Sequence, residues 1–223
     1  MTLRPPFRAA RRGDAPELAE LFAVCSGGVA QYVWESMRAS FPGLTPLEIG
    51  ARRYARDDID FSYRNCVVAE RDGRLAGLLL TFAVRERESD ASASADIPEI
   101  LRPYAALERP GTWYIGGLAA RPQYAALGLG RRFLELAATQ AQARGYAELS
   151  ALVFEQNRKV LRLCRRGGFA VVGRRPVVPH PLIHYTGDVV LLSAPAARIL
   201  TGRRGFTAHS RAPSRDADGV GAV

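Results

Sequence analysis

The residues best suited to chemistry lie in a turn with two glycines, Gly128-Leu129-Gly130. The turn follows an apolar stretch rich in strand formers, Trp113 to Ala120, and apolar residues recur after it at helical spacing over 129–137. A glycine turn that opens a helix leaves several backbone N–H groups free at the positive end of the helix dipole, where a phosphate binds well. A plain tight turn has the same glycines, so the surrounding segments must decide whether this one is an anion site.

Composition places the chain among soluble globular proteins. It has 223 residues, of which 48% are hydrophobic, and no apolar run approaches the ~20 residues of a membrane span. The N-terminus has no apolar signal segment, and the three cysteines, Cys25, Cys66 and Cys164, lack metal-ligand spacing. Free thiols in a reducing cytoplasm are the simplest interpretation, so we expect a cytoplasmic protein without a membrane segment or a metal site.

Positive charge is concentrated in one segment. The net charge is +9, Lys159 is the only lysine, and the abundance of arginine and alanine is consistent with a GC-rich bacterial genome. Between Gln156 and Gly187 seven residues are basic and none is acidic. Such a segment is either an ordinary solvated face or a field that attracts an anionic ligand. Without a recognition motif or interleaved aromatic residues, it does not favour nucleic acid as the partner.

The predicted elements alternate between strands and helices. Strands are expected at 7–9, 65–70, 75–84, 113–120, 148–154, 169–172 and 189–192. Helices are expected at 15–25, 29–38, 45–55, 97–107, 129–144 and 157–166. Asp14 and Glu17 fit a capping box for the first helix, Thr45 fits a cap for the third, and Gly116-Gly117 inside a strand fits a bulge or the close approach of another group. The fold class is therefore α/β, a mixed central β-sheet flanked by helices on both faces.

Residues 1–195 are predicted to form a single domain. Residues 85–110 are inserted between two strands and are longer than a usual hairpin connection, so they are a candidate lid or substrate loop. Residues 196–223 are predicted to be a C-terminal tail, polar and aperiodic beyond 202, and we expect it to be disordered.

Two motifs together resemble the GNAT (GCN5-related) N-acetyltransferase superfamily, over roughly residues 7–193. Pro122 to Gly130 is similar in length and in most positions to the family's Pro-x-x-Arg/Gln-Gly-x-Gly-Ile/Leu-Gly motif, which opens a helix after the fourth strand. Asn157 to Phe169 is similar to its second motif, Asn-x-x-Ala-x-x-Leu-Tyr-x-x-x-Gly-Phe. Phe7 to Ala15 also resembles the family's first strand and helix cap.

This resemblance implies an acyl-CoA N-acyltransferase fold and direct transfer of an acetyl group from acetyl-CoA to a primary amine of a small molecule or protein. In the family, the central strand and the next one, here 113–120 and 148–154, splay apart, and the pantetheine of coenzyme A runs beside the central strand. A backbone N–H polarises the thioester carbonyl. The implied cofactor-binding residues are Leu118, Ala119, Ala120, Ala125, Ala126, Leu127, Gly128, Leu129, Gly130, Arg131 and Asn157.

The sequence departs from the first motif at two positions. Ala125 stands where the family usually has Arg or Gln, and Ala126 where it usually has Gly. Backbone amides bind a pyrophosphate whatever the side chain, although a side-chain donor and a flexible glycine are lost. We hypothesise that Arg131, Arg132 or the basic residues of 158–166 compensate electrostatically.

The catalytic assignments are less direct. Cys164 stands where the family often has a Tyr that protonates the leaving thiolate, and a thiol with a pKa of about 8.5 can donate a proton. A small buried core residue is an equally good interpretation of Cys164. The central strand offers no carboxylate to deprotonate the amine, so Glu155 is the nearest candidate base, with His180 and His184 as alternatives.

Other hypotheses stay open at this point. A degenerate family member that binds CoA without catalysis, as a regulatory or interaction module, would also show the departures at Ala125, Ala126 and Cys164. The resemblance admits a homodimer. Acceptor choice would depend on residues 27–60 and 85–110, in which no motif identifies the amine.

Overall fold

The computed structural model describes residues 3–85 and 97–201. Within these residues the strands are β1 (Phe7–Ala9), β2 (Cys66–Arg71), β3 (Arg74–Ala83), β4 (Trp113–Ala120), β5 (Glu148–Phe154), β6 (Ala170–Pro176) and β7 (Asp188–Pro195). The α-helices are α1 (Ala15–Cys25), α2 (Val29–Ser36), α3 (Pro46–Tyr54), α4 (Arg102–Ala105), α5 (Leu129–Ala143), α6 (Arg158–Arg166) and α7 (Ala196–Thr201). A 3₁₀ turn, Pro122–Leu127, joins β4 to α5.

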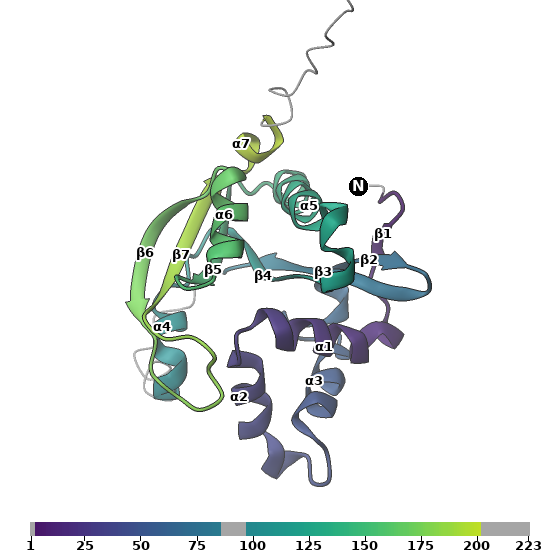
Figure 1. Ribbon diagram of the computed structural model, residues 1–223, viewed down its shortest axis with the longest axis vertical. Helices are drawn as coiled ribbons and strands as arrows, with labels where there is room; N and C mark the ends of the chain where they lie inside the picture. Colours follow the sequence, from purple (N-terminus) through teal and green to yellow (C-terminus); the bar gives the residue numbers. More distant parts are fainter. Residues whose placement is uncertain (1–2, 86–96, 202–223) are drawn as a thin grey trace, which may run out of the picture.

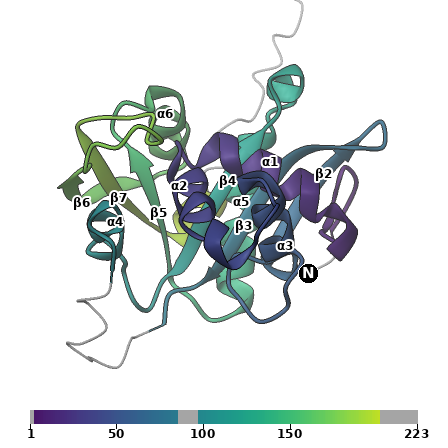
Figure 2. The same cartoon turned by 90° about the horizontal axis from the view of Figure 1, so that it is seen from below.

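One mixed sheet organises the molecule. Its strand order is β1-β2-β3-β4-β5-β7-β6, in which β4 and β5 are parallel and all other neighbours are antiparallel. Helices α5 and α6 cover one face, and α1, α2 and α3 lie against the other, as the two views in Figures 1 and 2 show. The predicted fold class is confirmed.

Each face of the sheet has its own hydrophobic core. On the α5 face, Phe133 packs with Leu149 and Leu192 of the strands. On the α1 face, Leu18 packs with Leu78 of β3. The strands serve both cores because successive side chains of a strand point to opposite faces.

The predicted bounds of β1, β4 and β5 agree with the structure, and Thr45 caps α3 in a capping box with Glu48. The end of the chain differs from the prediction. Residues 196–201, predicted to belong to a disordered tail, form α7, because Ala196 and Ile199 are buried and the helix packs on α5. Residues 202–223 of the predicted tail and residues 86–96 of the predicted lid lie outside the described residues.

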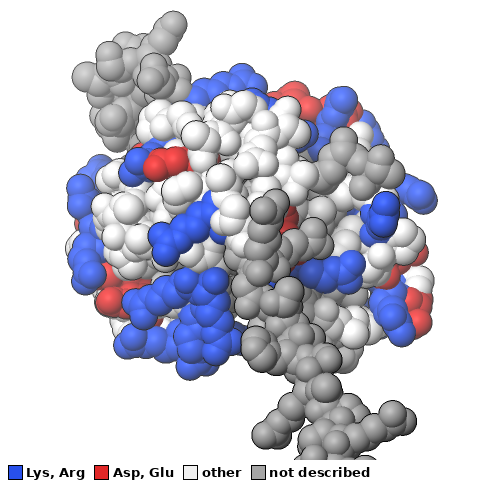
Figure 3. All heavy atoms as spheres, turned by 90° about the horizontal axis from the view of Figure 1, so that it is seen from above, with Lys and Arg blue, Asp and Glu red and all other residues white. Residues whose placement is uncertain are grey.

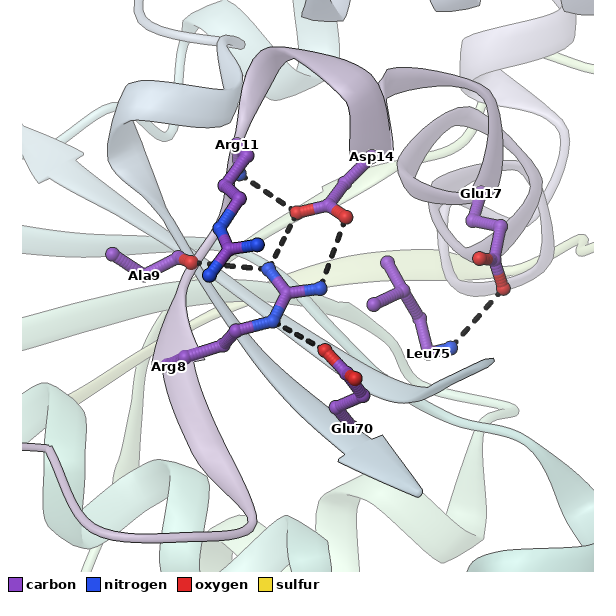
Figure 4. A network of polar contacts seen from close by, with 7 residues as sticks. All are labelled: Arg8, Ala9, Arg11, Asp14, Glu17, Glu70 and Leu75. Carbon is purple, nitrogen blue, oxygen red and sulfur yellow. Dashed lines mark hydrogen bonds and ion pairs between the residues drawn. The ribbon is translucent and has the colours of Figure 1, made fainter. Parts of the chain in front are cut away.

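The capping box predicted from Asp14 and Glu17 does not form at α1. The Asp14 carboxylate instead accepts the Arg11 backbone N–H at 2.7 Å and two hydrogen bonds from the Arg8 guanidinium, at 2.7 and 3.0 Å (Figure 4). Arg8 also donates to Glu70 of β2 at 2.5 Å. The carboxylate thus joins β1 to the start of α1, a tertiary role that local sequence does not reveal.

The Arg8–Asp14 pair predicts a pH-dependent stability. Burial alone would raise the pKa of Asp14, but hydrogen bonds from Arg8 and Arg11 outweigh it and hold that pKa below its usual value. Such a group stabilises the fold above its unfolded pKa of about 3.9, and this contribution is lost as the pH falls through the folded pKa. We expect Arg8→Met to lower the free energy of unfolding by about 2 kcal/mol at pH 7 and by much less at pH 2, measured by urea unfolding.

Arg38→Met is the matched control for this experiment. Arg38 pairs with Glu35 at 3.0 Å, but both side chains are exposed to solvent. An exposed pair is worth about 0.5 kcal/mol or less, so this variant should lose little at either pH. Equal losses at pH 7 and pH 2 for Arg8→Met would show that the ionisation of Asp14 is not what Arg8 stabilises.

The two edges of the sheet differ. At one edge β1 has only 3 residues. At the other edge β6 has 7 residues, and Val171, Val172, Arg174 and Arg175 are all exposed on it. The longer open edge therefore carries both apolar and basic side chains.

Candidate active site at the opening between β4 and β5

The parallel strands β4 and β5 pair over only part of their length. Trp113–Ile115 pair with Leu149–Ala151, and no further pairs follow between these two described strands. Beyond this point β4 pairs with β3 up to Ala120, and β5 pairs with β7 up to Phe154. The second half of β4 therefore keeps a backbone edge that faces β5 without bonding to it.

A bulge in β4 lies at the point where the strands part. Leu80 pairs with Gly117 and Thr81 pairs with Ile115, so Gly116 is the extra residue in β4. This confirms the bulge predicted at Gly116-Gly117. A bulge increases local twist and bends the strand, which helps β4 to turn away from β5.

Beyond the bulge, the backbone amide of Leu118 is directed at the α1 face. It contacts the thiol of Cys25 at the end of α1. Burial raises the pKa of Cys25 to about 12, and the Leu118 amide opposes this rise. Sequence reasoning placed Leu118 in the site and missed Cys25, because only the packing of α1 on β4 brings the two together.

The predicted glycine turn follows β4 directly. Pro122–Leu127, which includes Ala125 and the exposed Ala126, forms the 3₁₀ turn, and Gly128 has a φ of +64°, a left-handed conformation that favours glycine. No described atom lies within 4 Å of where a Cβ on Gly128 would be, so the space over the turn is open. The first N–H groups of α5 have no partners within the helix and can bind an anion there.

The second glycine of the turn, Gly130, is required for a different reason. A Cβ on Gly130 would lie 2.8 Å from Cδ2 of Leu163 in α6. Gly130 thus lets the start of α5 pack closely against α6, which brings the two predicted motifs into contact.

Arg121 anchors the start of the turn. Its guanidinium donates to the Leu75 carbonyl at 2.9 Å and to the carboxylates of Glu17 and Glu20 in α1, at 3.1 and 2.9 Å. Glu17 also accepts the backbone N–H of Leu75 at 3.1 Å (Figure 4), so it is used here and not in a capping box. The turn is therefore tied to β3 and α1 before α5 begins.

Asn157 lies at the end of β5, across the opening. Its Oδ1 accepts the Val160 backbone N–H at 3.2 Å, so the residue is the N-cap of α6. This contact orients the amide and leaves its Nδ2 donors without a partner among the described residues. Asn157 therefore combines a structural hydrogen bond with a free donor pair.

Basic side chains gather on the face that carries α5 and α6 (Figure 3). The exposed members on α6 are Arg158, Lys159, Arg162, Arg165 and Arg166. On α5, Arg131 pairs with Glu135 at 3.1 Å and stays largely exposed, whereas the Arg132 guanidinium lies over the Phe7 ring, 4.4 Å from its centroid. This face attracts an anion to the side of the sheet on which the glycine turn lies.

Cys164 lies in the hydrophobic core beneath α6. It is 3% exposed, and burial raises its pKa to about 12. A thiol with this pKa is a poor proton donor to a thiolate whose own pKa is near 8.5. Its surroundings favour the interpretation of Cys164 as a core residue.

The three candidate bases lie at the end of β5 and in the β6–β7 loop. Glu155 follows β5, and its carboxylate is 3.9 Å from Arg174 of β6, on the far side of β5 from β4. In the β6–β7 loop, His180 accepts the Leu182 N–H through Nδ1 at 3.1 Å, which leaves the proton of the neutral ring on Nε2, and His184 is exposed.

Comparison with known proteins agrees with this geometry. The sequence model of the Acetyltransferase (GNAT) family matches residues 30–169. Among curated proteins, none matches the sequence. In the described part of the chain, no helix has the length and apolar character needed to span a bilayer.

Solved structures share the fold at low sequence identity. An N-acetyltransferase from Staphylococcus aureus Mu50 has a TM-score of 0.58 and 17% identity, covering 84% of this chain and 99% of that one. The ribosomal-protein-S18-alanine N-acetyltransferase from Escherichia coli has a TM-score of 0.52 and 16% identity, covering 85% and 92%. The protein yncA from Salmonella typhimurium, solved with its cofactor acetyl-CoA, has a TM-score of 0.51 and 16% identity, covering 85% and 92%. These likenesses show a shared fold, and the family match over residues 30–169 shows that the chain belongs to the GNAT acetyltransferase family.

Proposed function

We propose that this protein transfers an acetyl group directly from acetyl-CoA to a primary amine. The observation that carries the proposal is the opening after Ile115 and Ala151, flanked by the Gly128 turn at the end of β4 and by Asn157 at the end of β5. An unpaired strand edge can bond to an extended amide chain, and a helix N-terminus binds phosphates. Pantetheine and pyrophosphate, joined in one molecule, offer both groups.

Each part of the site has a proposed role. The backbone of Leu118, Ala119 and Ala120 lies beside the pantetheine, and a backbone N–H of β4 polarises the thioester carbonyl. Asn157 donates from Nδ2 to a carbonyl of the pantetheine arm. The amides of residues 125–131 hold the pyrophosphate, for which the exposed turn is accessible from solvent.

Proton transfer is proposed to occur without Cys164 and Glu155. The thiolate of coenzyme A is a fair leaving group, so an acid is dispensable, and the buried Cys164 is a core residue. The amine must lose a proton before it attacks, and no side chain of β4 or of the second half of β5 is a carboxylate. Water in the opening therefore carries the proton away.

Arg131 is proposed to supply the charge that Ala125 cannot. We expect Arg131→Ala to weaken CoA binding about threefold, because it removes an exposed cation from the first turn of α5. Arg132→Ala is the matched control, since Arg132 contacts Phe7, and it should bind CoA almost normally. Calorimetry with CoA measures both, and equal affinities in both variants and the wild type would remove Arg131 from the phosphate site.

Thiol release from acetyl-CoA, measured with a broad panel of amines, tests the function. Turnover with at least one amine, together with a titratable CoA site, is the expected result. CoA binding with no turnover for any amine would favour the alternative of a regulatory CoA-binding module, which the alanines at 125 and 126 motivate. Absence of CoA binding would overturn both.

The setting of this activity is also part of the proposal. The three cysteines, Cys25, Cys66 and Cys164, are free thiols, as a reducing cytoplasm would keep them. We place the protein there as an enzyme of a bacterial cell that acts on a soluble amine or a protein amine. A homodimer stays a prediction.

A further inference from the structure

The α1 face of the sheet carries a row of aromatic rings that leads to the opening. The row comprises Tyr54 of α3, Phe22 of α1, Phe61, Phe82 of β3 and Tyr114 of β4. Successive ring centroids are 5.3 to 5.7 Å apart, all in edge-to-face geometry. This arrangement is the favourable one for aromatic pairs.

The rings of this row leave no room for a side chain at either glycine of the β4 bulge. A Cβ on Gly117 would lie 2.9 Å from Cδ2 of Phe22, and a Cβ on Gly116 would lie 2.8 Å from Cε1 of Phe82. The rings therefore lie directly on the β4 backbone where it leaves β5. Tyr114 ends the row at the opening, because its hydroxyl hydrogen-bonds with the backbone of Leu152 in β5.

A second aromatic group lies on the other side of the opening. Phe154, at the end of β5, stacks on Tyr185 with centroids 4.6 Å apart and contacts Tyr104 at 6.0 Å. Tyr185 belongs to the β6–β7 loop, where it also lines an open cavity of about 290 Å³ together with His180. Aromatic rings thus flank the opening on the β4 side and on the β5 side.

Tyr54 and Phe154 are buried, but the other rings are only partly buried. Phe22, Phe61, Phe82, Tyr114 and Tyr185 all keep some exposed surface. Scattered exposed apolar residues need no explanation, but a contiguous apolar surface beside a reaction site is typical of a ligand-binding surface. Its continuity with the opening means that a molecule bound there would lie next to the thioester.

The charge at one end of the aromatic row indicates how a bound amine would lie along it. At the far end, Arg53 is half-buried beside Tyr54. An ammonium is therefore disfavoured at the Tyr54 end, so the amino group of a bound molecule is expected at the other end, next to the opening.

We propose that the acceptor is a monoamine whose amino group is attached through a short chain to an aromatic or similarly flat apolar body. The body lies on the row from Phe22 to Tyr114, and the amine reaches the opening. Polyamines and small hydroxylated amines lack one or both of these features. This inference rests on the proposed acetyl transfer.

The test compares three amines as acceptors of the wild-type protein: 2-phenylethylamine, ethanolamine and spermidine. The first two share an aminoethyl group and differ only in the attached body. We expect kcat/KM for 2-phenylethylamine to exceed that for ethanolamine by at least about tenfold, as burial of one ring would give. A preference for spermidine or ethanolamine would overturn the inference while leaving acetyl transfer intact.

Phe82→Leu and Tyr146→Leu provide the matched variants. Phe82 lies in the row between Phe61 and Tyr114, whereas Tyr146 packs against Trp113 in the core on the α5 face. We expect Phe82→Leu to reduce the preference for 2-phenylethylamine and Tyr146→Leu to keep it. Equal preferences in both variants would remove the row from acceptor binding.

A binding measurement separates this inference from the proposed function. With CoA bound, calorimetric titration of 2-phenylethylamine should detect binding that Phe82→Leu weakens. Binding of this kind without turnover of any amine would contradict acetyl transfer and keep the aromatic site. Absence of binding and of turnover for 2-phenylethylamine would reject the aromatic acceptor.

Discussion

Replacing Gly28 by alanine is expected to lower the free energy of unfolding by about 4 kcal/mol, the largest loss of any single methyl addition proposed for this chain. Gly28 has a φ of +98°, and an added Cβ would lie 1.7 Å from the carbonyl oxygen of Leu182 and 2.8 Å from its carbonyl carbon. Both atoms are backbone, so no side-chain rotation relieves the clash. To relieve the clash, the α1–α2 turn must separate from the β6–β7 loop. A hydrogen bond also joins these two segments, in which the His184 N–H donates to the Gly27 carbonyl at 2.9 Å.

Gly43→Ala is the control for backbone conformation alone. Gly43 has a φ of +81°, but no described atom lies within 4 Å of its added Cβ. This variant should lose only about 1 kcal/mol, the cost of placing an L-residue in a left-handed conformation. Urea unfolding of both variants separates the two causes, and similar losses would mean that the loop moves away from Gly28 without cost.

Asn157→Ser is expected to raise the KM for acetyl-CoA about tenfold while leaving stability almost unchanged. Serine is as good an N-cap as asparagine, so the hydrogen bond that Oδ1 makes to the Val160 N–H at 3.2 Å can be replaced. The Nδ2 donors are lost, and one of the pantetheine carbonyls then has no partner. Steady-state kinetics and thermal unfolding measure the two effects independently.

Asn157→Ala completes this comparison. It removes both the cap and the donors, so it should show the same rise in KM and, in addition, a loss of about 1 kcal/mol in stability. If Asn157→Ser kept the wild-type KM and only Asn157→Ala raised it, the residue would act through the position of α6 and not by binding acetyl-CoA.

Elements with a local cause could be predicted from the sequence. β1, β4 and β5 were predictable because each is a short run of strand formers ended by turn residues, and the Thr45–Glu48 box because both partners lie within one turn. The Gly128 turn and Asn157 were found because they fall in the two segments that resemble GNAT family motifs, and the structure places them at the ends of two adjacent parallel strands. Local pattern was sufficient for these elements because the residues that form each one lie close together in the chain.

Features whose partners lie in other elements of the fold could not be predicted. The same pattern that suggested a capping box at Asp14 was overridden by Arg8, and Glu17 was engaged by Arg121, which is more than a hundred positions away. Cys164 has the spacing of the family motif, yet its burial beneath α6 is a property of packing. The aromatic row joins residues from Phe22 to Tyr114, a contact that no periodicity reveals.

The open edge at β6 has a consequence for self-association. A second copy that extended the sheet in antiparallel pairing would bring Arg174 and Arg175 of one copy close to those of the other. Like charges in such positions repel, and natural sheets use charged edge residues in this way to prevent growth into larger aggregates. We expect this charge to disfavour pairing through the exposed Val171 and Val172, so any homodimer of this chain is expected to form through another surface.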